Sequence, residues 1–205
     1  SSVEYSPSLI PGLGSLYHPV STNSADAQRF FNQGLTLLYG FNHYEAIRSF
    51  KYAAKLDPQL AMAHWGIALA LGPNINSANH KAAYEAIQKA STLASNASKH
   101  EQAYIAALAK RYSSDPGTSL KHLSIAYRNA MRELVQQYPD DLDAVTLYAE
   151  SAMDLHPWKL WSPDGKPSED TEEITSVLES VLKRDPKHCG ANHLYIHAVE
   201  ASSRP

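Results

Sequence analysis

Apolar residues recur along this chain at the three- and four-residue spacing of a helix, from residue 25 almost to the end. Phe30, Leu37 and Leu38 mark one face over residues 25–40, and Ala46 and Phe50 mark the next over residues 43–56. No run of β-branched residues alternates with polar ones as it would in a strand. The pattern therefore predicts an all-α fold. About nine helices are expected, over residues 25–40, 43–56, 59–71, 79–94, 99–112, 118–137, 141–155, 169–184 and 189–202.

Residues 1–24 form a segment of a different kind. Three prolines and two glycines forbid a continuous helix there, so an extended conformation is expected. The segment also carries apolar side chains that a purely solvated tail would not need, namely Leu9, Ile10, Leu13, Leu16 and Val20. We expect it to pack on its own domain or on a neighbouring subunit. The helical domain is expected over residues 25–202, and its continuation beyond the last residue is left open.

The first two helices carry a spaced set of small, aromatic and proline residues. Gly34 and Ala46 would let the helices approach closely, Phe50 would fill the space between pairs, and Pro58 would begin the next element. This pattern resembles the tetratricopeptide repeat, whose period is about 34 residues and which ends in a late proline. Gln33 departs from the leucine of that pattern. The second-helix spacing recurs twice, in Tyr127, Met131, Leu134 and Pro139 and in Ile174, Leu178, Val181 and Pro186.

The resemblance implies an architecture and a kind of function. Tetratricopeptide arrays are right-handed α-solenoids of antiparallel helix pairs, in which the first helices of successive pairs line a concave groove. Residues 40–46, 65–74 and 192–201 are also similar to a group of bacterial tetratricopeptide-containing proteins of poorly defined function. That group suggests no reaction. The resemblance therefore implies a scaffold that binds a protein or peptide, or that assembles with itself.

Composition narrows the classes of partner. The chain has 205 residues, a net charge of −3 and 19% charged residues, so a nucleic-acid partner is not expected. No run of apolar residues is long enough to span a membrane. The single cysteine excludes an intrachain disulfide. The first residue is Ser rather than Met, which a processed, exported protein or an incomplete sequence would both explain; of the two locations, an exported one, periplasmic or extracellular, is slightly favoured over a cytoplasmic one. Asn96, Ala97 and Ser98 form a glycan-acceptor triplet, which is a weak signal and would matter only in an exported protein whose cell adds glycans.

Two histidines and a carboxylate form the clearest chemical constellation. His193, His197 and Glu200 fall within about 60° of one another on a helical wheel, opposite the apolar Leu194 and Ala198. Two imidazoles one turn apart with a carboxylate are suitable ligands for zinc, copper or iron. A solvated polar face would show the same pattern, and so would a surface that contacts a peptide. The sequence leaves these three interpretations open.

An acidic stripe is expected beside these histidines. Asp143, Glu150 and Asp154 fall within about 40° of one another, and His156 follows at the end of the same helix. The helix over residues 141–155 and the helix over residues 189–202 would be neighbours in the groove. The groove would then be lined by Asp143, Glu150, Asp154, His193, His197 and Glu200, and the candidate metal ligands are His193, His197, Glu200, Glu150, Asp154 and His156.

The remaining candidates have ordinary explanations beside the functional ones. Trp158 and Trp161 would anchor the long loop, with a carbohydrate-stacking platform as the alternative. Cys189 beside His188 is a weak nucleophile candidate. No motif of a zinc protease, a serine hydrolase or a nucleotide-binding loop is present. The other histidines include four that are read as surface residues, namely His18, His80, His100 and His122.

These patterns favour a non-enzymatic helical-repeat scaffold. Both ends of the array lack an obvious polar cap, so an end-to-end contact between copies, closing into a ring or growing into a filament, is one form of assembly. The N-terminal segment could then reinforce the contact by lying on the next subunit. The alternative is a metal-binding protein or a metal-dependent enzyme that uses the His193, His197 and Glu200 stripe.

Overall fold

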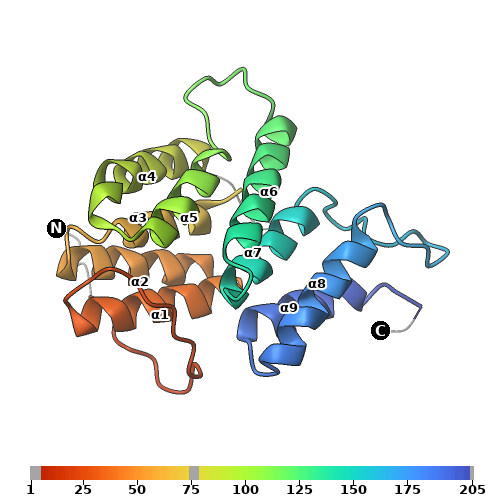
Figure 1. Cartoon of the computed structure of the whole chain (residues 1–205), viewed down its shortest axis with the longest axis horizontal. Helices are drawn as coiled ribbons and strands as arrows, with labels where there is room; N and C mark the ends of the chain where they lie inside the picture. Colours follow the sequence, from red (N-terminus) through yellow and green to blue (C-terminus); the bar gives the residue numbers. More distant parts are fainter. Residues whose placement is uncertain (1–5, 74–78, 204–205) are drawn as a thin grey trace. The chain divides into compact units, whose positions relative to one another are not determined.

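The computed structural model describes residues 6–73 and 79–203. Within these residues the chain is all helical, as predicted, and each predicted helix boundary lies within three residues of the observed one. One short 3-10 helix covers Ala94–Asn96. The nine α-helices of the described residues, drawn in Figure 1, are α1 (Ala25–Tyr39), α2 (His43–Leu56), α3 (Ala61–Leu71), α4 (His80–Leu93), α5 (Lys99–Ala109), α6 (Leu120–Gln137), α7 (Leu142–Met153), α8 (Thr171–Arg184) and α9 (Cys189–Val199).

The chain divides into two compact units. The first holds the N-terminal segment, α1 to α4 and most of α5, and ends at Ala106. The second begins at Ala107 and holds α6 to α9. In the first unit α1 packs on α2, α2 on α3, α3 on α4, and α1 also contacts α3. In the second unit α6 to α9 pack in chain order, and α7 also contacts α9. Among α1 to α4 and among α6 to α9, therefore, helices that follow one another in the chain pack together, and one further contact joins helices two apart.

The ring of Phe50 determines how closely the first three helices pack. Phe50 lies on α2 and is completely buried. A Cβ atom added at Gly34 on α1 would lie 2.7 Å from this ring, and one added at Gly66 on α3 would lie 2.6 Å from it. Both distances are shorter than side-chain packing allows, so only glycine fits on either side. The predicted role of Phe50, to fill the space between helix pairs, is confirmed.

Three helix-to-helix turns in the chain have the same hydrogen bonds. In each, the N–H of the residue after the helix donates to the carbonyl four residues earlier, at 2.8–2.9 Å. The carbonyl of that same residue then accepts from the N–H three residues later, at 3.1 Å. The three turns join α2 to α3, α6 to α7 and α8 to α9, and their prolines are Pro58, Pro139 and Pro186. A proline has no backbone N–H to donate. Its position in this turn donates no hydrogen bond, so the missing N–H costs no stability.

Buried apolar residues and one polar network hold the second unit together. The six apolar residues of the two later proline-terminated motifs are all buried. Arg132 of α6 donates to the Tyr148 hydroxyl of α7 at 3.0 Å, and that hydroxyl donates to Glu173 of α8 at 2.5 Å. One network therefore ties three successive helices together.

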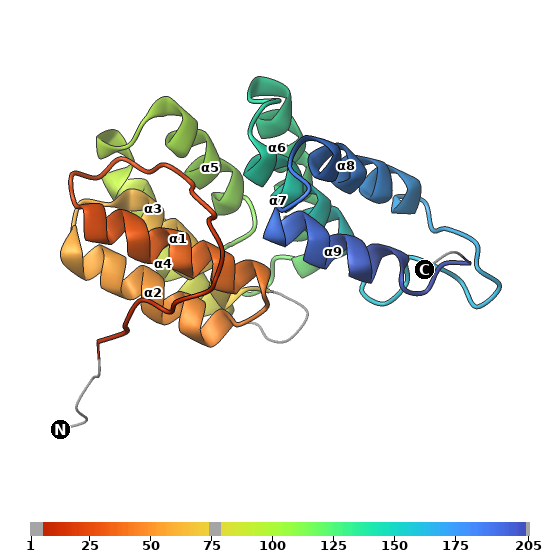
Figure 2. The same ribbon diagram turned by 90° about the horizontal axis from the view of Figure 1, so that it is seen from below.

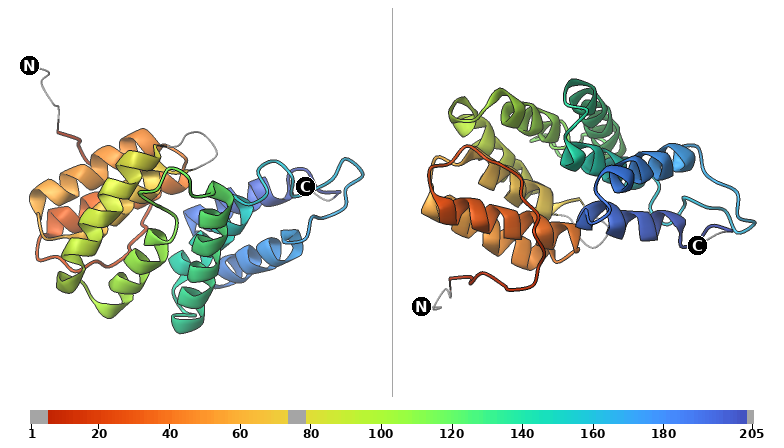
Figure 3. Two further views of the ribbon diagram at one scale, coloured as in Figure 1. Left: turned by 90° about the horizontal axis from the view of Figure 1, so that it is seen from above. Right: turned by 60° about the horizontal axis from the view of Figure 1, so that its bottom comes forward.

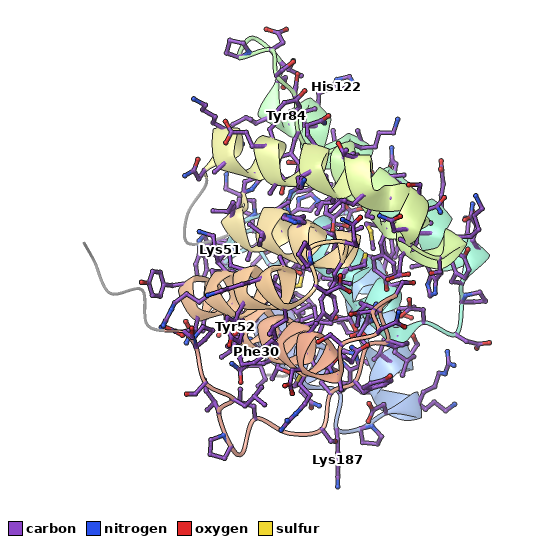
Figure 4. All side chains as sticks on the ribbon, turned by 90° about the vertical axis from the view of Figure 1, so that its left-hand side faces the viewer. Phe30, Lys51, Tyr52, Tyr84, His122 and Lys187 are labelled. Atoms are coloured by element: carbon purple, nitrogen blue, oxygen red, sulfur yellow. The ribbon has the colours of Figure 1, made fainter. Side chains whose placement is uncertain are left out.

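The N-terminal segment packs on its own chain. Residues 6–24 run along α1 in the same unit, as Figures 2 and 3 show. Of the two locations that the sequence left open, its own domain is the one observed. Between α1 and α2, Phe30 packs against Tyr52 with ring centroids 4.6 Å apart (Figure 4). In the described part of the chain, no helix combines the length and the apolar character that crossing a membrane requires.

Gly34→Ala is expected to destabilise the first unit by about 1–3 kcal/mol, because its Cβ would overlap the Phe50 ring. Urea unfolding followed by circular dichroism measures the change. The matched control is Gly40→Ala at the end of α1, where φ is −84° and the nearest atom would lie 3.5 Å away. Gly40→Ala should stay within about 0.5 kcal/mol of the parent. Equal stability of Gly34→Ala and the parent would show that the Phe50 contact does not limit the helix approach.

Candidate functional site

The two histidines of α9 lie side by side. The Nε2 atoms of His193 and His197 are 3.1 Å apart, and their ring centroids are 4.8 Å apart. The Nδ1 atom of His197 lies 3.0 Å from a carboxylate oxygen of Glu200. On the other side of α9, Leu194 and Ala198 are buried. The structure thus brings together the His193, His197 and Glu200 stripe on the partly exposed face of the helix.

His188 fixes the start of α9 and joins it to α7. Its Nδ1 accepts a hydrogen bond from the Ala191 N–H at 3.1 Å, so it caps the helix. Because Nδ1 accepts, the ring proton sits on Nε2, which lies 3.1 Å from a carboxylate oxygen of Asp143. The expected neighbourhood of α7 and α9 is confirmed by their contact. Asp143, one of the predicted groove residues, therefore accepts a hydrogen bond from His188 of the same chain.

Cys189 stands next to this cap and has an unreactive environment. The side chain is partly buried, and burial is the main cause that raises the pKa of its thiol. Nearby Asp143 acts in the same direction. A thiol with a raised pKa holds little thiolate at neutral pH, and the thiolate is the attacking form. The environment of Cys189 therefore suits a structural role.

The other two residues of the predicted acidic stripe, Glu150 on α7 and Asp154 just after it, lie around a buried arginine that sequence reasoning missed. Arg111, which is 4% exposed, donates to Asp154 at 2.7 Å and lies over the Tyr127 ring at 4.9 Å. Burial raises the pKa of Glu150 to about 8, and the charge of Asp154 adds to this rise while Arg111 opposes it. Burial also raises the pKa of Asp154, while the charge and the hydrogen bond of Arg111 oppose that rise. Because Arg111 bonds Asp154 directly, the cluster favours a negative charge on Asp154 and a proton on Glu150.

His156 lies with a different set of partners. Its Nε2 atom is 2.7 Å from Asp170, and Arg128 is 3.6 Å from the same carboxylate. α7 ends at Met153, so the helical wheel no longer describes where His156 points. The six predicted metal ligands thus fall into three groups. Counting only the described residues, neither unit by itself holds three His, Cys, Asp or Glu side chains whose ligand atoms all lie within 4.8 Å of one another.

The two tryptophans of the long loop have different surroundings. The Trp161 indole N–H donates to the carbonyl of Ala198 at 2.7 Å, which fastens the loop to the end of α9. Trp158 is 77% exposed and has a positive φ of 61°. The loop-anchoring role is thus visible for Trp161. Trp158 is one large exposed ring, without a described part in that anchor.

The polar face of α1 binds the backbone of the N-terminal segment. Gln33 accepts from the Ile10 N–H at 2.8 Å and donates to the Ser8 carbonyl at 3.1 Å. Gln28 accepts from the Val20 N–H at 3.0 Å and donates to the His18 carbonyl at 2.7 Å. A side-chain amide has one donor and one acceptor side, so it can pair with an extended chain as a strand would. Gln33, the departure from the repeat pattern, is thereby explained.

His18 anchors this segment and was wrongly expected on the surface. It is 6% exposed and packs against Phe31 of α1 and Tyr104 of α5, with ring centroids 5.9 and 5.5 Å away. Three residues later, the Ser21 N–H donates to Glu101 of α5 at 2.7 Å, and the Ser21 hydroxyl donates to the same carboxylate. A sequence pattern of one apolar stripe could not show this, because the partners come from two distant helices.

No family model matches the chain, and no curated protein matches it.

Glu150→Gln is expected to stabilise the protein more at pH 8 than at pH 5. The folded-state pKa of about 8 exceeds the ordinary 4.5, so between these values the folded state holds a proton that the unfolded state has lost. Stability therefore falls as pH rises through this range, and a neutral glutamine removes that fall. The gain at pH 8 should be about 1–3 kcal/mol, measured by thermal and urea unfolding at both pH values.

Glu133→Gln on α6 is the matched control, since it removes one exposed carboxylate from the same unit. It should leave the pH dependence of unfolding as it is in the parent. A Glu150→Gln variant with the same difference from the parent at pH 5 and pH 8 would contradict the buried, protonated state of Glu150.

Proposed function

We propose that this protein is a non-enzymatic helical-repeat scaffold that binds extended polypeptide segments. In this proposal the two units are parts of a right-handed solenoid of tetratricopeptide-like helix pairs. Two features of the chain support that architecture. One is Phe50 between Gly34 and Gly66, and the other is the turn that recurs with the same hydrogen bonds at three prolines.

The observation that carries the proposal is the binding of residues 8–21 by α1 and α5. Five of the bonds involved join a side-chain amide to a backbone group of the segment: those of Gln28 and Gln33, and one from the His18 N–H to Asn32. Backbone groups are common to all sequences, so these bonds favour an extended conformation rather than one particular sequence. Selectivity would come from the buried His18 ring and from Glu101, which accepts bonds from Ser21.

In the second unit the proposed groove is less open to a partner than the sequence suggested. Asp143 bonds His188, and Asp154 pairs with Arg111. We therefore assign the polypeptide-binding role to the α1 face. A second copy is one partner with the right chemistry, because its own residues 6–24 match this face. An end-to-end contact at α1 would have to exchange or displace the segment that already lies there.

A fluorescent peptide of residues 6–24 tests the α1 face. The chain lacking residues 1–22 should bind it with a Kd in the micromolar range, and the parent at least tenfold more weakly, because a tethered segment competes at about millimolar effective concentration. Fluorescence anisotropy gives both values. Gln33→Ala in the shortened chain should weaken binding, as should a peptide with His18→Ala.

A second measurement uses the whole chain, in case the shortened chain loses its fold. The double variant Gln28→Ala with Gln33→Ala should speed hydrogen exchange at the Ile10 and Val20 amides, while amides within α3 keep the parent's rates. Unchanged exchange at Ile10 and Val20, or a shortened chain that melts like the parent and binds no peptide, would refute the α1 face as a peptide site.

Light scattering over a range of concentrations tests assembly between copies. If copies exchange residues 6–24, the mean mass should rise with concentration, and removal of residues 1–22 should abolish the rise. A monodisperse monomer at high concentration would count against self-assembly and would leave a different polypeptide as the partner.

A further inference from the structure

The spacing of the two α9 imidazoles matches that of two ligands on one metal ion. Metal–nitrogen bonds of histidine are about 2.0–2.1 Å long. With the two Nε2 atoms 3.1 Å apart, such bonds would meet at an angle of roughly 100°, between the values of square and tetrahedral coordination. The separation of the two nitrogens therefore suits one ion, and the rings need to turn only so far that both lone pairs face it.

Glu200 is positioned to orient one of the two histidine ligands and not to act as a third ligand. Its carboxylate lies 3.0 Å from Nδ1 of His197, on the opposite edge of the ring from Nε2. An Nδ1–H that donates to this carboxylate leaves the Nε2 lone pair directed towards His193. A carboxylate on the far nitrogen of a histidine is the usual outer partner of a metal ligand, because it fixes the ring and makes it more basic.

The local field also favours a cation at this place. His197 lies in the last turn of α9, and Glu200 is the residue that ends the helix. The unpaired carbonyls of a helix C-terminus carry partial negative charge, which stabilises positive charge nearby. The His197 side chain is 33% exposed and that of Glu200 is 50% exposed, so an ion could arrive from solvent and keep water as its remaining ligands.

We propose that His193 and His197 bind one divalent transition-metal ion through their Nε2 atoms, with Glu200 holding His197 in the required tautomer. Two protein ligands make an open site of moderate affinity. Among divalent ions the order of affinity for nitrogen ligands places Cu²⁺ first, so Cu²⁺ is the probe that reveals the site most strongly. This binding is independent of the α1 face and of the proposed scaffold function.

The experiment titrates the whole, metal-free chain with Cu²⁺, followed by calorimetry and by electron paramagnetic resonance. One equivalent should bind with a spectrum of nitrogen coordination. His193→Ala and His197→Ala should each weaken that binding at least tenfold, and Glu200→Gln should weaken it about tenfold or more while keeping both nitrogens. Cu²⁺ should also raise the melting temperature of the parent and not that of His197→Ala, since only the folded helix presents the pair.

The matched control is His122→Ala. His122 is an exposed histidine on α6, labelled in Figure 4, with no histidine three or four residues away. Replacing His122 should leave the binding of the first equivalent of Cu²⁺ unchanged. His197→Asn serves as a second variant that keeps a polar side chain if His197→Ala alters the circular dichroism spectrum. Binding that is weakened equally by His122→Ala and His197→Ala, or a chain that binds no first equivalent, would overturn the site.

Discussion

The contact between one aromatic ring and two glycines constrains the packing of the first unit. Phe50 lies between α1 and α3, and the absence of a Cβ at Gly34 and Gly66 lets both helices reach its faces. Because the ring is wholly buried, its size sets the helix separation, and the neighbouring rings of Phe31 and Trp65 extend the same core. The α1 surface that binds the N-terminal segment is oriented by this packing, since Gln33 adjoins Gly34.

The features that suggest a function involve polar residues at buried positions, where the helical pattern would place apolar ones. Gln33 stands where the repeat pattern expects leucine, and its amide joins Ile10 and Ser8 of the N-terminal segment to Ser49 of α2. In the second unit, Arg111 is buried against Tyr127 and balanced by Asp154. A buried polar group costs free energy unless it is paired, so each of these residues fixes the position of its partner. The proposed peptide face and the buried Arg111–Asp154 pair both follow from such pairing.

The two candidate activities rest on different physics and on different units. Polypeptide binding at α1 depends on side-chain amides that match an extended backbone, which is a matter of hydrogen-bond geometry. Metal binding at α9 depends on one helical turn placing two Nε2 atoms 3.1 Å apart, which is a property of a single helix. A scaffold could carry both, because neither requires the other.

The sequence alone determined what depends on local spacing. Helical periodicity located the nine helices of the described residues, proline positions located the turns, and one turn of helix placed His193 beside His197. Only the tertiary structure decided what depends on residues far apart in the chain. In the tertiary structure His18 is buried between α1 and α5, and Arg111 pairs with Asp154. His156 contacts Asp170 and not α9. The physical reason is that a helical wheel fixes only the direction of a side chain, whereas its partner is set by how separate helices pack.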